Sequence, residues 1–184
     1  MWYNKLDGGI LMYKIGDLVV YENTGVCKVV DITEPEFIKP ERRKLCYVLE
    51  PVFKKGTIYT PVDELKAFLR PVMNKEEALN TIDRILITEV EAYTGKKSQE
   101  LEDKYKNAMK THNCYDLMKL IMSIHIRKEE SLANNKKISQ VDDRYSKQVQ
   151  DLIDEELSIA LDIPKEEVDS FIEMKLCAKQ VNTI

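Results

Sequence analysis

The sequence predicts an α+β protein, in which a small and strongly bent β-barrel is followed by an all-α domain of about five helices. Two observations predict this class. Up to residue 72, apolar residues alternate with a period of two in short segments bounded by Gly- and Pro-bearing turns. After residue 72 the apolar period changes to 3.6. We therefore expect domains at 12–72 and 73–184, and we expect residues 1–11 to be an N-terminal extension ahead of a natural start at Met12.

The first two strands are expected at 18–21 and 26–32. Gly25 in the turn between them supplies a positive φ at low cost. In the second strand, alternation places Val26, Lys28, Val30 and Ile32 on one face and Cys27, Val29 and Asp31 on the other.

Three further extended segments complete the β half. A charged loop at 34–43 contains two prolines, and strands are expected at 45–49 and 57–60, paired as a hairpin around Gly56. A short extended piece at 68–72 closes the unit. Four or five short strands in about sixty residues suit an SH3-like or Tudor-like barrel.

The helices of residues 73–184 are predicted from capping residues and from apolar residues spaced along one helix face. Asn74, with Glu77 at the capping-box position, begins a helix expected to continue to Thr94-Gly95. The other expected boundaries are a start at Ser98, a break at His112-Asn113, an end near Asn134-Asn135, an N-cap at Ser139 with Asp142 at the box position, and a last helix opening at Pro164.

No motif in the chain carries a reaction. There is no Gly-rich phosphate loop, GxSxG, HExxH or CxxC, and we expect no metal, no cofactor and no catalytic residue. The spacing of the four cysteines matches no zinc site, so they are expected to be reduced thiols, with a buried Cys27–Cys46 pair as the alternative. His112 and His125 are expected at the surface or rim, so an enzyme is only the third of the rival interpretations, after the two given below.

The net charge of −4 excludes a strongly basic nucleic-acid binder. Residues 12–72 hold ten basic against nine acidic residues, and residues 73–184 hold seventeen against twenty-two. In the helical half, the stretch from Lys96-Lys97 to Lys110 is locally positive. It predicts at most a weak, salt-sensitive contact with phosphates, or else an ordinary solvated helix.

A small barrel leaves edge strands that a partner strand can extend through backbone hydrogen bonds. We expect the segments 45–49 and 57–60 to lie at this rim. Tyr47 and Tyr59 either anchor the partner or simply cover the barrel.

One set of motifs resembles a known family. They are Lys14-x-Gly16-Asp17-x-Val19-Val20-Tyr21-x-x-x-Gly25, Tyr47-Val48-Leu49, Ile58-Tyr59-x-Pro61, Tyr105-Lys106, the segment 123–128, Ser139 and Ile163-Pro164. Over residues 12–176 this pattern resembles the CarD family, whose β module also occurs in transcription-repair coupling factors. No helicase motor is present here, which favours CarD-like regulators themselves.

The resemblance implies a non-enzymatic bacterial regulator in the cytoplasm, associated with the nucleoid through RNA polymerase. It implies a Tudor-like domain that docks on the polymerase β subunit by extending its sheet, and a helical domain that touches promoter DNA at the upstream edge of the bubble and props the open complex. The implied polymerase-binding residues are Tyr47, Val48, Leu49, Ile58, Tyr59 and Thr60. The resemblance implies Leu101, Lys104, Lys106 and Arg144 as DNA-binding residues, and we add Lys110 because it is four residues from Lys106 and shares its helix face.

The sequence departs from the family at the position of a DNA-wedging Trp, where it has Leu101. Leu is a smaller wedge, and Leu101 also lies on the apolar stripe, so a core role is the alternative. Two further rivals stay open: a polymerase-binding adaptor whose helical half meets protein, and a KOW-like ribosome-associated barrel. We expect a monomer in which the free edge permits strand swapping.

Overall fold

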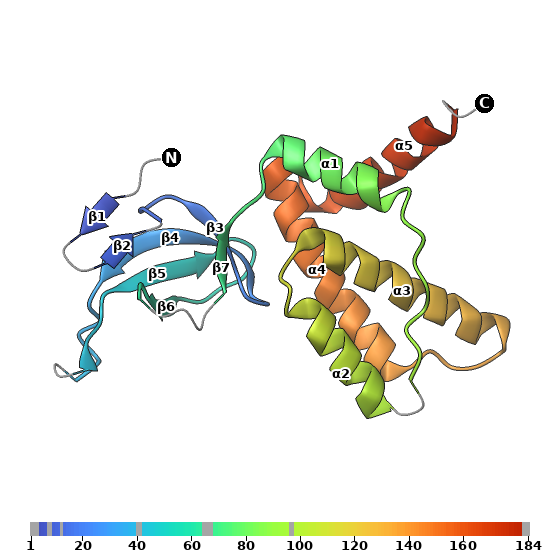
Figure 1. Cartoon of the computed structure of the whole chain (residues 1–184), viewed down its shortest axis with the longest axis horizontal. Helices are drawn as coiled ribbons and strands as arrows, with labels where there is room; N and C mark the ends of the chain where they lie inside the picture. Colours follow the sequence, from blue (N-terminus) through green and yellow to red (C-terminus); the bar gives the residue numbers. More distant parts are fainter. Residues whose placement is uncertain are drawn as a thin grey trace. The chain divides into compact units, whose positions relative to one another are not determined.

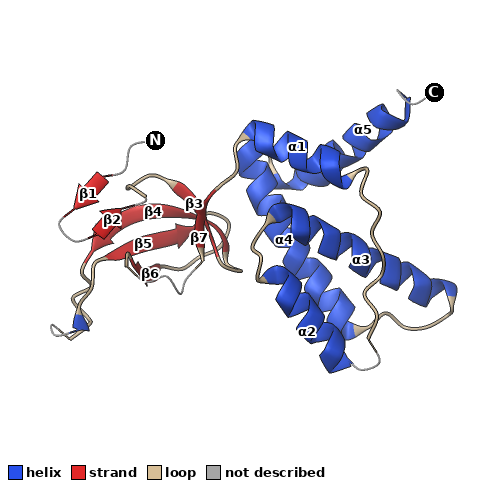
Figure 2. Ribbon diagram, viewed as in Figure 1, coloured by secondary structure: helices blue, strands red, loops and turns tan. Residues whose placement is uncertain are grey.

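The computed structural model describes residues 4–6, 9–11, 13–39, 42–63, 68–95 and 98–181. The chain divides into two compact units, residues 1–72 and 73–184 (Figure 1). The first unit is built mainly of strands and the second of helices (Figure 2). The expected α+β class is confirmed.

The main sheet of the first unit is antiparallel and has the strand order β6-β5-β4-β3-β7. Its strands are β3 (Leu18–Tyr21), β4 (Gly25–Thr33), β5 (Cys46–Pro51), β6 (Ile58–Pro61) and β7 (Leu69–Pro71). A separate hairpin pairs β1 (Asn4–Leu6) with β2 (Gly9–Leu11). Within the described residues β6 and β7 end the main sheet and do not pair with each other, so the sheet is open and leaves the edge strands that we expected of a small Tudor-like barrel.

A β-bulge changes the expected alternation of β4. The register with β5 shifts between Val29 and Asp31. The additional residue, Val30, reverses the side of the sheet to which the later residues of β4 point. Ile32 therefore packs against the same core as Cys27 and Val29, and its assignment to the face of Val26 and Lys28 was wrong.

The turn before β3 is fastened to the middle of the sheet. Gly16 has a φ of +97°, which favours glycine, and its N–H donates to the Val29 carbonyl at 2.7 Å. Val29 N–H in turn donates to the Asp17 carbonyl at 2.9 Å, and Lys14 N–H donates to Asp17 Oδ2 at 2.9 Å. The Lys14-x-Gly16-Asp17 motif is thus a turn that fixes the start of the sheet.

The core of the β unit combines aliphatic side chains with two tyrosines. The rings of Tyr13 and Tyr47 meet edge to face with centroids 5.8 Å apart, and Tyr13 N–H donates to Tyr47 Oη at 3.2 Å. The buried members of this core are Tyr13, Val19, Cys27, Val29, Tyr47 and Leu49.

The helical unit contains α1 (Lys75–Ile85), α2 (Ser98–Met109), α3 (Cys114–Ala133), α4 (Gln140–Leu161), the short 3₁₀ helix η2 (Lys165–Glu167) and α5 (Val168–Val181). The capping box of Asn74 and Glu77 is confirmed, with both reciprocal hydrogen bonds present. The predicted start at Ser98, the break at His112-Asn113 and the end at Asn134 are also confirmed.

Two predicted helix features were wrong. The first helix ends at Ile85, not at Thr94-Gly95, because Tyr93 N–H donates to Ser123 Oγ of α3 at 2.8 Å and so holds an irregular segment against that helix. Asp142 is not a capping-box partner. Its carboxylate turns into the core, and Ser139 Oγ instead accepts from Val141 N–H at 3.2 Å.

A buried polar network joins three helices of this unit to the irregular segment. Asp142 is only 1% exposed; it accepts from Tyr105 Oη at 2.7 Å and from Arg127 Nε at 3.4 Å. Arg127 Nη1 also donates to the Tyr93 carbonyl at 2.8 Å. Burial, and then the hydrogen bond to Asp142, raises the pKa of Tyr105, so its hydroxyl stays a donor. The network therefore fixes where residues 86–95 lie.

Candidate functional site

The first candidate site is the β6 edge of the sheet. Val62 N–H donates to the Leu45 carbonyl at 2.9 Å, in the same register that pairs Thr60 with Tyr47 and Tyr59 with Val48. Hydrogen-bonded and non-hydrogen-bonded pairs alternate in an antiparallel ladder. The backbone N–H and C=O of Tyr59 therefore point away from β5, and no strand in the described part of the chain pairs with them.

The opposite edge, β7, is closed to a partner strand by its own residues. Glu22 N–H donates to the Phe68 carbonyl at 3.0 Å, so by the same alternation Leu69 and Pro71 face outward. The Leu69 carbonyl already accepts from Tyr13 Oη at 3.1 Å, and Pro71 has no N–H. Of the two edges of the main sheet, β6 is the one that can accept a strand.

The six residues predicted to bind polymerase differ in their exposure and in their distance from the sheet edge. The expectation that 45–49 forms part of the rim was wrong, because β5 pairs with β4 on one side and β6 on the other. Tyr47, Val48 and Leu49 are buried, Thr60 is buried and Ile58 is half-buried. Tyr59 is the one member of the set with an exposed side chain, at 42%.

Sequence reasoning missed a second aromatic residue beside this edge. Phe37, in the loop between β4 and β5, is 71% exposed, and its ring meets the ring of Tyr59 at 81° with centroids 5.0 Å apart. An aromatic side chain in a loop rich in charged residues is the sequence signal that could have drawn attention to it. Phe37 and Tyr59 form an exposed aromatic pair, which we call the aromatic clamp.

In the helical unit, Leu101 lies in the core. Its side chain is 3% exposed and belongs to the same buried cluster as Tyr105 and Met109. A Cβ added at Gly95 would lie 3.4 Å from the Cβ of Leu101, which shows how closely the irregular segment covers it. A DNA wedge at this position would have to leave that core.

The basic residues predicted to bind DNA are engaged by acidic or amide groups. Glu102 is bracketed by Lys106 Nζ at 2.8 Å and Arg144 Nη2 at 3.0 Å. The hydrogen bond from Lys106 and then that from Arg144 lower the pKa of Glu102, which stays ionised. Lys104 pairs with Glu100 at 3.2 Å, and Lys110 Nζ donates to Asn107 Oδ1 at 3.1 Å. Lys96 and Lys97, also part of the predicted positive stretch, lie outside the described residues.

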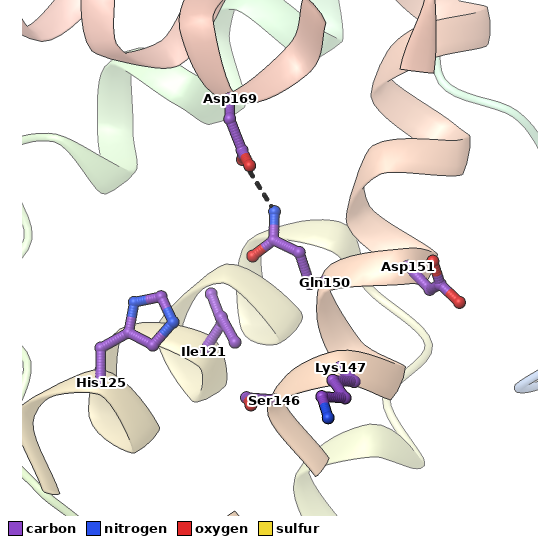
Figure 3. Close-up of a pocket in the computed structure, with 7 residues that line it drawn as sticks. All are labelled: Ile121, His125, Ser146, Lys147, Gln150, Asp151 and Asp169. Carbon is purple, nitrogen blue, oxygen red and sulfur yellow. Dashed lines mark hydrogen bonds between the residues drawn. The ribbon is translucent and has the colours of Figure 1, made fainter. Parts of the chain in front are cut away.

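A surface pocket of about 460 Å³ between α3, α4 and α5 contains His125 (Figure 3). Burial, and then the charge of Lys128, lowers the pKa of His125. The nearby Ser146 hydroxyl donates to the Asp143 carbonyl at 3.1 Å and accepts from Lys128 Nζ at 2.6 Å. The dashed contact in Figure 3 joins Gln150 to Asp169 at 2.9 Å. These contacts hold the helices together and do not pair a nucleophile with a base.

The described residues contain neither a candidate membrane-spanning helix nor a candidate metal site. None of their helices combines the length and apolar character that crossing a bilayer requires. Their His, Cys, Asp and Glu side chains form no group of three or more that could hold a metal ion.

Comparison with known families identifies the β unit. Residues 13–73 match the family model of the CarD-like/TRCF RID domain. A search of curated proteins finds no match to the chain. The family match ends where the helical unit begins, so the resemblance of residues 74–176 to CarD stays a prediction. The matched range holds the turn at Gly16, the β7 edge and the open β6 edge, and residues 13–73 are thus similar to a domain family that interacts with RNA polymerase.

Proposed function

We propose that this chain is a CarD-like transcription regulator of the bacterial cytoplasm, without catalytic activity, that binds the RNA polymerase β subunit by adding a strand of that subunit to β6. The observation that carries this proposal is the contrast between the two edges. Tyr59 presents its backbone N–H and C=O outward, whereas β7 is closed by Tyr13 and Pro71. In a family that interacts with polymerase, the open edge is the natural docking element.

The short edge sets the strength of this interaction. Pro61 can accept but not donate a hydrogen bond, so a partner strand pairs chiefly around Tyr59. A backbone hydrogen bond contributes about 1 kcal/mol net, so a few of them support a reversible complex. The protein acts as a monomer in this proposal, with one copy on each polymerase.

Tyr59→Pro tests the proposed edge directly. Proline at this position removes the outward N–H without removing a bond to β5, whereas Tyr59→Ala removes only the ring. Tyr59→Pro is expected to bind core RNA polymerase about tenfold more weakly than Tyr59→Ala, because it leaves a partner carbonyl unsatisfied. Affinities are measured by fluorescence titration of the full-length variants.

Ile87→Ala, at an exposed apolar position of the helical unit, is the control and should bind like the parent protein. Equal affinities of Tyr59→Pro and Tyr59→Ala would show that polymerase does not pair with β6. Thermal unfolding followed by circular dichroism checks that both variants are folded.

The helical unit, in the same proposal, touches promoter DNA weakly near the upstream edge of the bubble and modulates open-complex stability. Lys104, Lys106, Lys110 and Arg144 would supply phosphate contacts, and Leu101 would support them from the core. Because Glu102 neutralises part of this charge, DNA has to compete with it for Lys106 and Arg144. The contact is expected to be weak and to disappear at moderate salt.

Glu102→Gln should strengthen the DNA contact. Removing this carboxylate frees the Lys106 and Arg144 side chains from their ion pairs. The affinity for a forked promoter duplex is therefore expected to rise by about threefold at low salt. Glu166→Gln makes the same charge change at an exposed site in η2 and serves as the matched control. Gel shifts in which both variants bind DNA alike would argue against phosphate contacts at Lys106 and Arg144.

A second candidate is a polymerase-binding adaptor whose helical unit contacts protein. The acidic balance of residues 73–184 and the burial of Leu101 favour it. Gel shifts on a forked promoter with and without polymerase separate the two functions. An adaptor adds no DNA protection in either case.

A further inference from the structure

We propose that the polymerase segment that pairs with β6 carries an apolar side chain in register with Tyr59, and that the aromatic clamp of Phe37 and Tyr59 selects this side chain. The inference rests on the proposed function, because it requires a strand on β6. It adds the chemical identity of the recognised residue and assigns Phe37 a role in specificity.

The direction of the side chains on β6 defines the position of the recognised residue. Thr60 and Ile58 are opposite Tyr47 and Leu49, and Ile58 packs against the same core as those two residues. Tyr59 lies between them and faces the other side of the sheet, where Phe37 meets it. A partner residue hydrogen-bonded directly opposite Tyr59 points to this same side, with its Cβ about 5.5 Å from that of Tyr59.

The loop that presents Phe37 is braced on both sides of this residue. Arg43 Nε donates to the Ile38 carbonyl at 2.9 Å, and Arg43 Nη2 donates to the Glu36 carbonyl at 3.1 Å. Ile38 N–H also closes a turn onto the Pro35 carbonyl at 3.2 Å. Because Arg43 braces the backbone on both sides of Phe37, this part of the loop loses little conformational entropy when a partner covers the ring.

The surroundings of the clamp favour an apolar partner over a charged one. A side chain enclosed by Tyr59, Phe37 and a paired strand loses water, and a charge there needs a counter-ion. Asp63, the described carboxylate closest in sequence to β6, is already paired with Lys44 at 3.2 Å, and Glu36, next to Phe37, is exposed to water, which weakens its attraction for a charge in the clamp. An aliphatic or aromatic side chain has no such requirement and covers the exposed ring of Phe37.

The test compares Tyr59→Pro and three further variants of the full-length protein in their affinity for purified bacterial core RNA polymerase. Phe37→Ala is expected to weaken binding about tenfold. Phe37→Leu keeps an apolar surface and is expected to stay within about threefold of the parent protein. Ile15→Ala, at a 58% exposed position of the same unit, should not change the affinity.

Three outcomes would overturn the inference. If Phe37→Ala binds normally while Tyr59→Pro binds weakly, the edge docks polymerase but the clamp does not select, and the proposed function stands. If Phe37→Leu is as weak as Phe37→Ala, the partner side chain is a cation held on the ring face rather than an apolar group. If Tyr59→Pro also binds normally, the docking edge and the inference fail together.

Discussion

Asp142→Ala is expected to lower the free energy of unfolding by about 3 kcal/mol. The carboxylate is buried and is hydrogen-bonded by Tyr105 at 2.7 Å and by Arg127 at 3.4 Å. Its removal leaves a largely buried guanidinium and a buried hydroxyl without their acceptor, and breaking such a pair from one side costs about 3–5 kcal/mol. We expect a cost at the lower end of this range because the Arg127 side chain keeps some contact with solvent. Urea unfolding followed at 222 nm measures the loss.

Asp143→Ala is the matched control one residue away. The Asp143 side chain is half-exposed and pairs with Lys147 at 2.9 Å and Lys128 at 3.5 Å. Exposed ion pairs contribute less than about 1 kcal/mol. A cost for Asp142→Ala no larger than that for Asp143→Ala would mean that the buried network does not stabilise the helical unit.

Leu101→Ala is the second variant with a large expected effect, about 2–4 kcal/mol of lost stability. The side chain is almost fully buried against the core of the helical unit and beneath Gly95. Truncating a buried leucine loses apolar burial and leaves a cavity that the surrounding helices only partly fill. Leu132→Ala, at an exposed position of α3, should cost less than about 0.5 kcal/mol.

The same variant separates a core residue from a DNA wedge. Below its melting temperature, folded Leu101→Ala should leave the lifetime of the promoter open complex unchanged at saturating protein. A shorter lifetime with only a small loss of stability would instead support insertion of Leu101 into DNA.

Local signals in the sequence predicted most element types. Asn74 and Glu77 mark a helix start because both capping-box bonds form within four residues. Gly25 marks the β3–β4 turn because its φ of +100° is costly for other residues. The strands β3 to β7 likewise arise from short apolar segments between turns.

Features that depend on distant residues were not predictable in this way. The bulge at Val30 is defined by the pairing of β4 with β5, and the end of α1 depends on contacts of Tyr93 with α3. Which of the two hairpin strands lies at the edge also depends on the whole sheet order. Phe37 was missed because its significance comes from Tyr59, more than twenty positions away.

The hydroxyl of Tyr13 on the Leu69 carbonyl has a consequence for self-assembly. A sheet that can be lengthened at both ends can stack copy upon copy into a growing fibre. In this protein the β7 edge is occupied by the Tyr13 hydroxyl and by Pro71, so further copies are not added at that edge of the sheet. Of the two edges of the described main sheet, β6 is the one through which two copies could join, as a closed two-fold pair, and such a pair could not bind polymerase through the same strands.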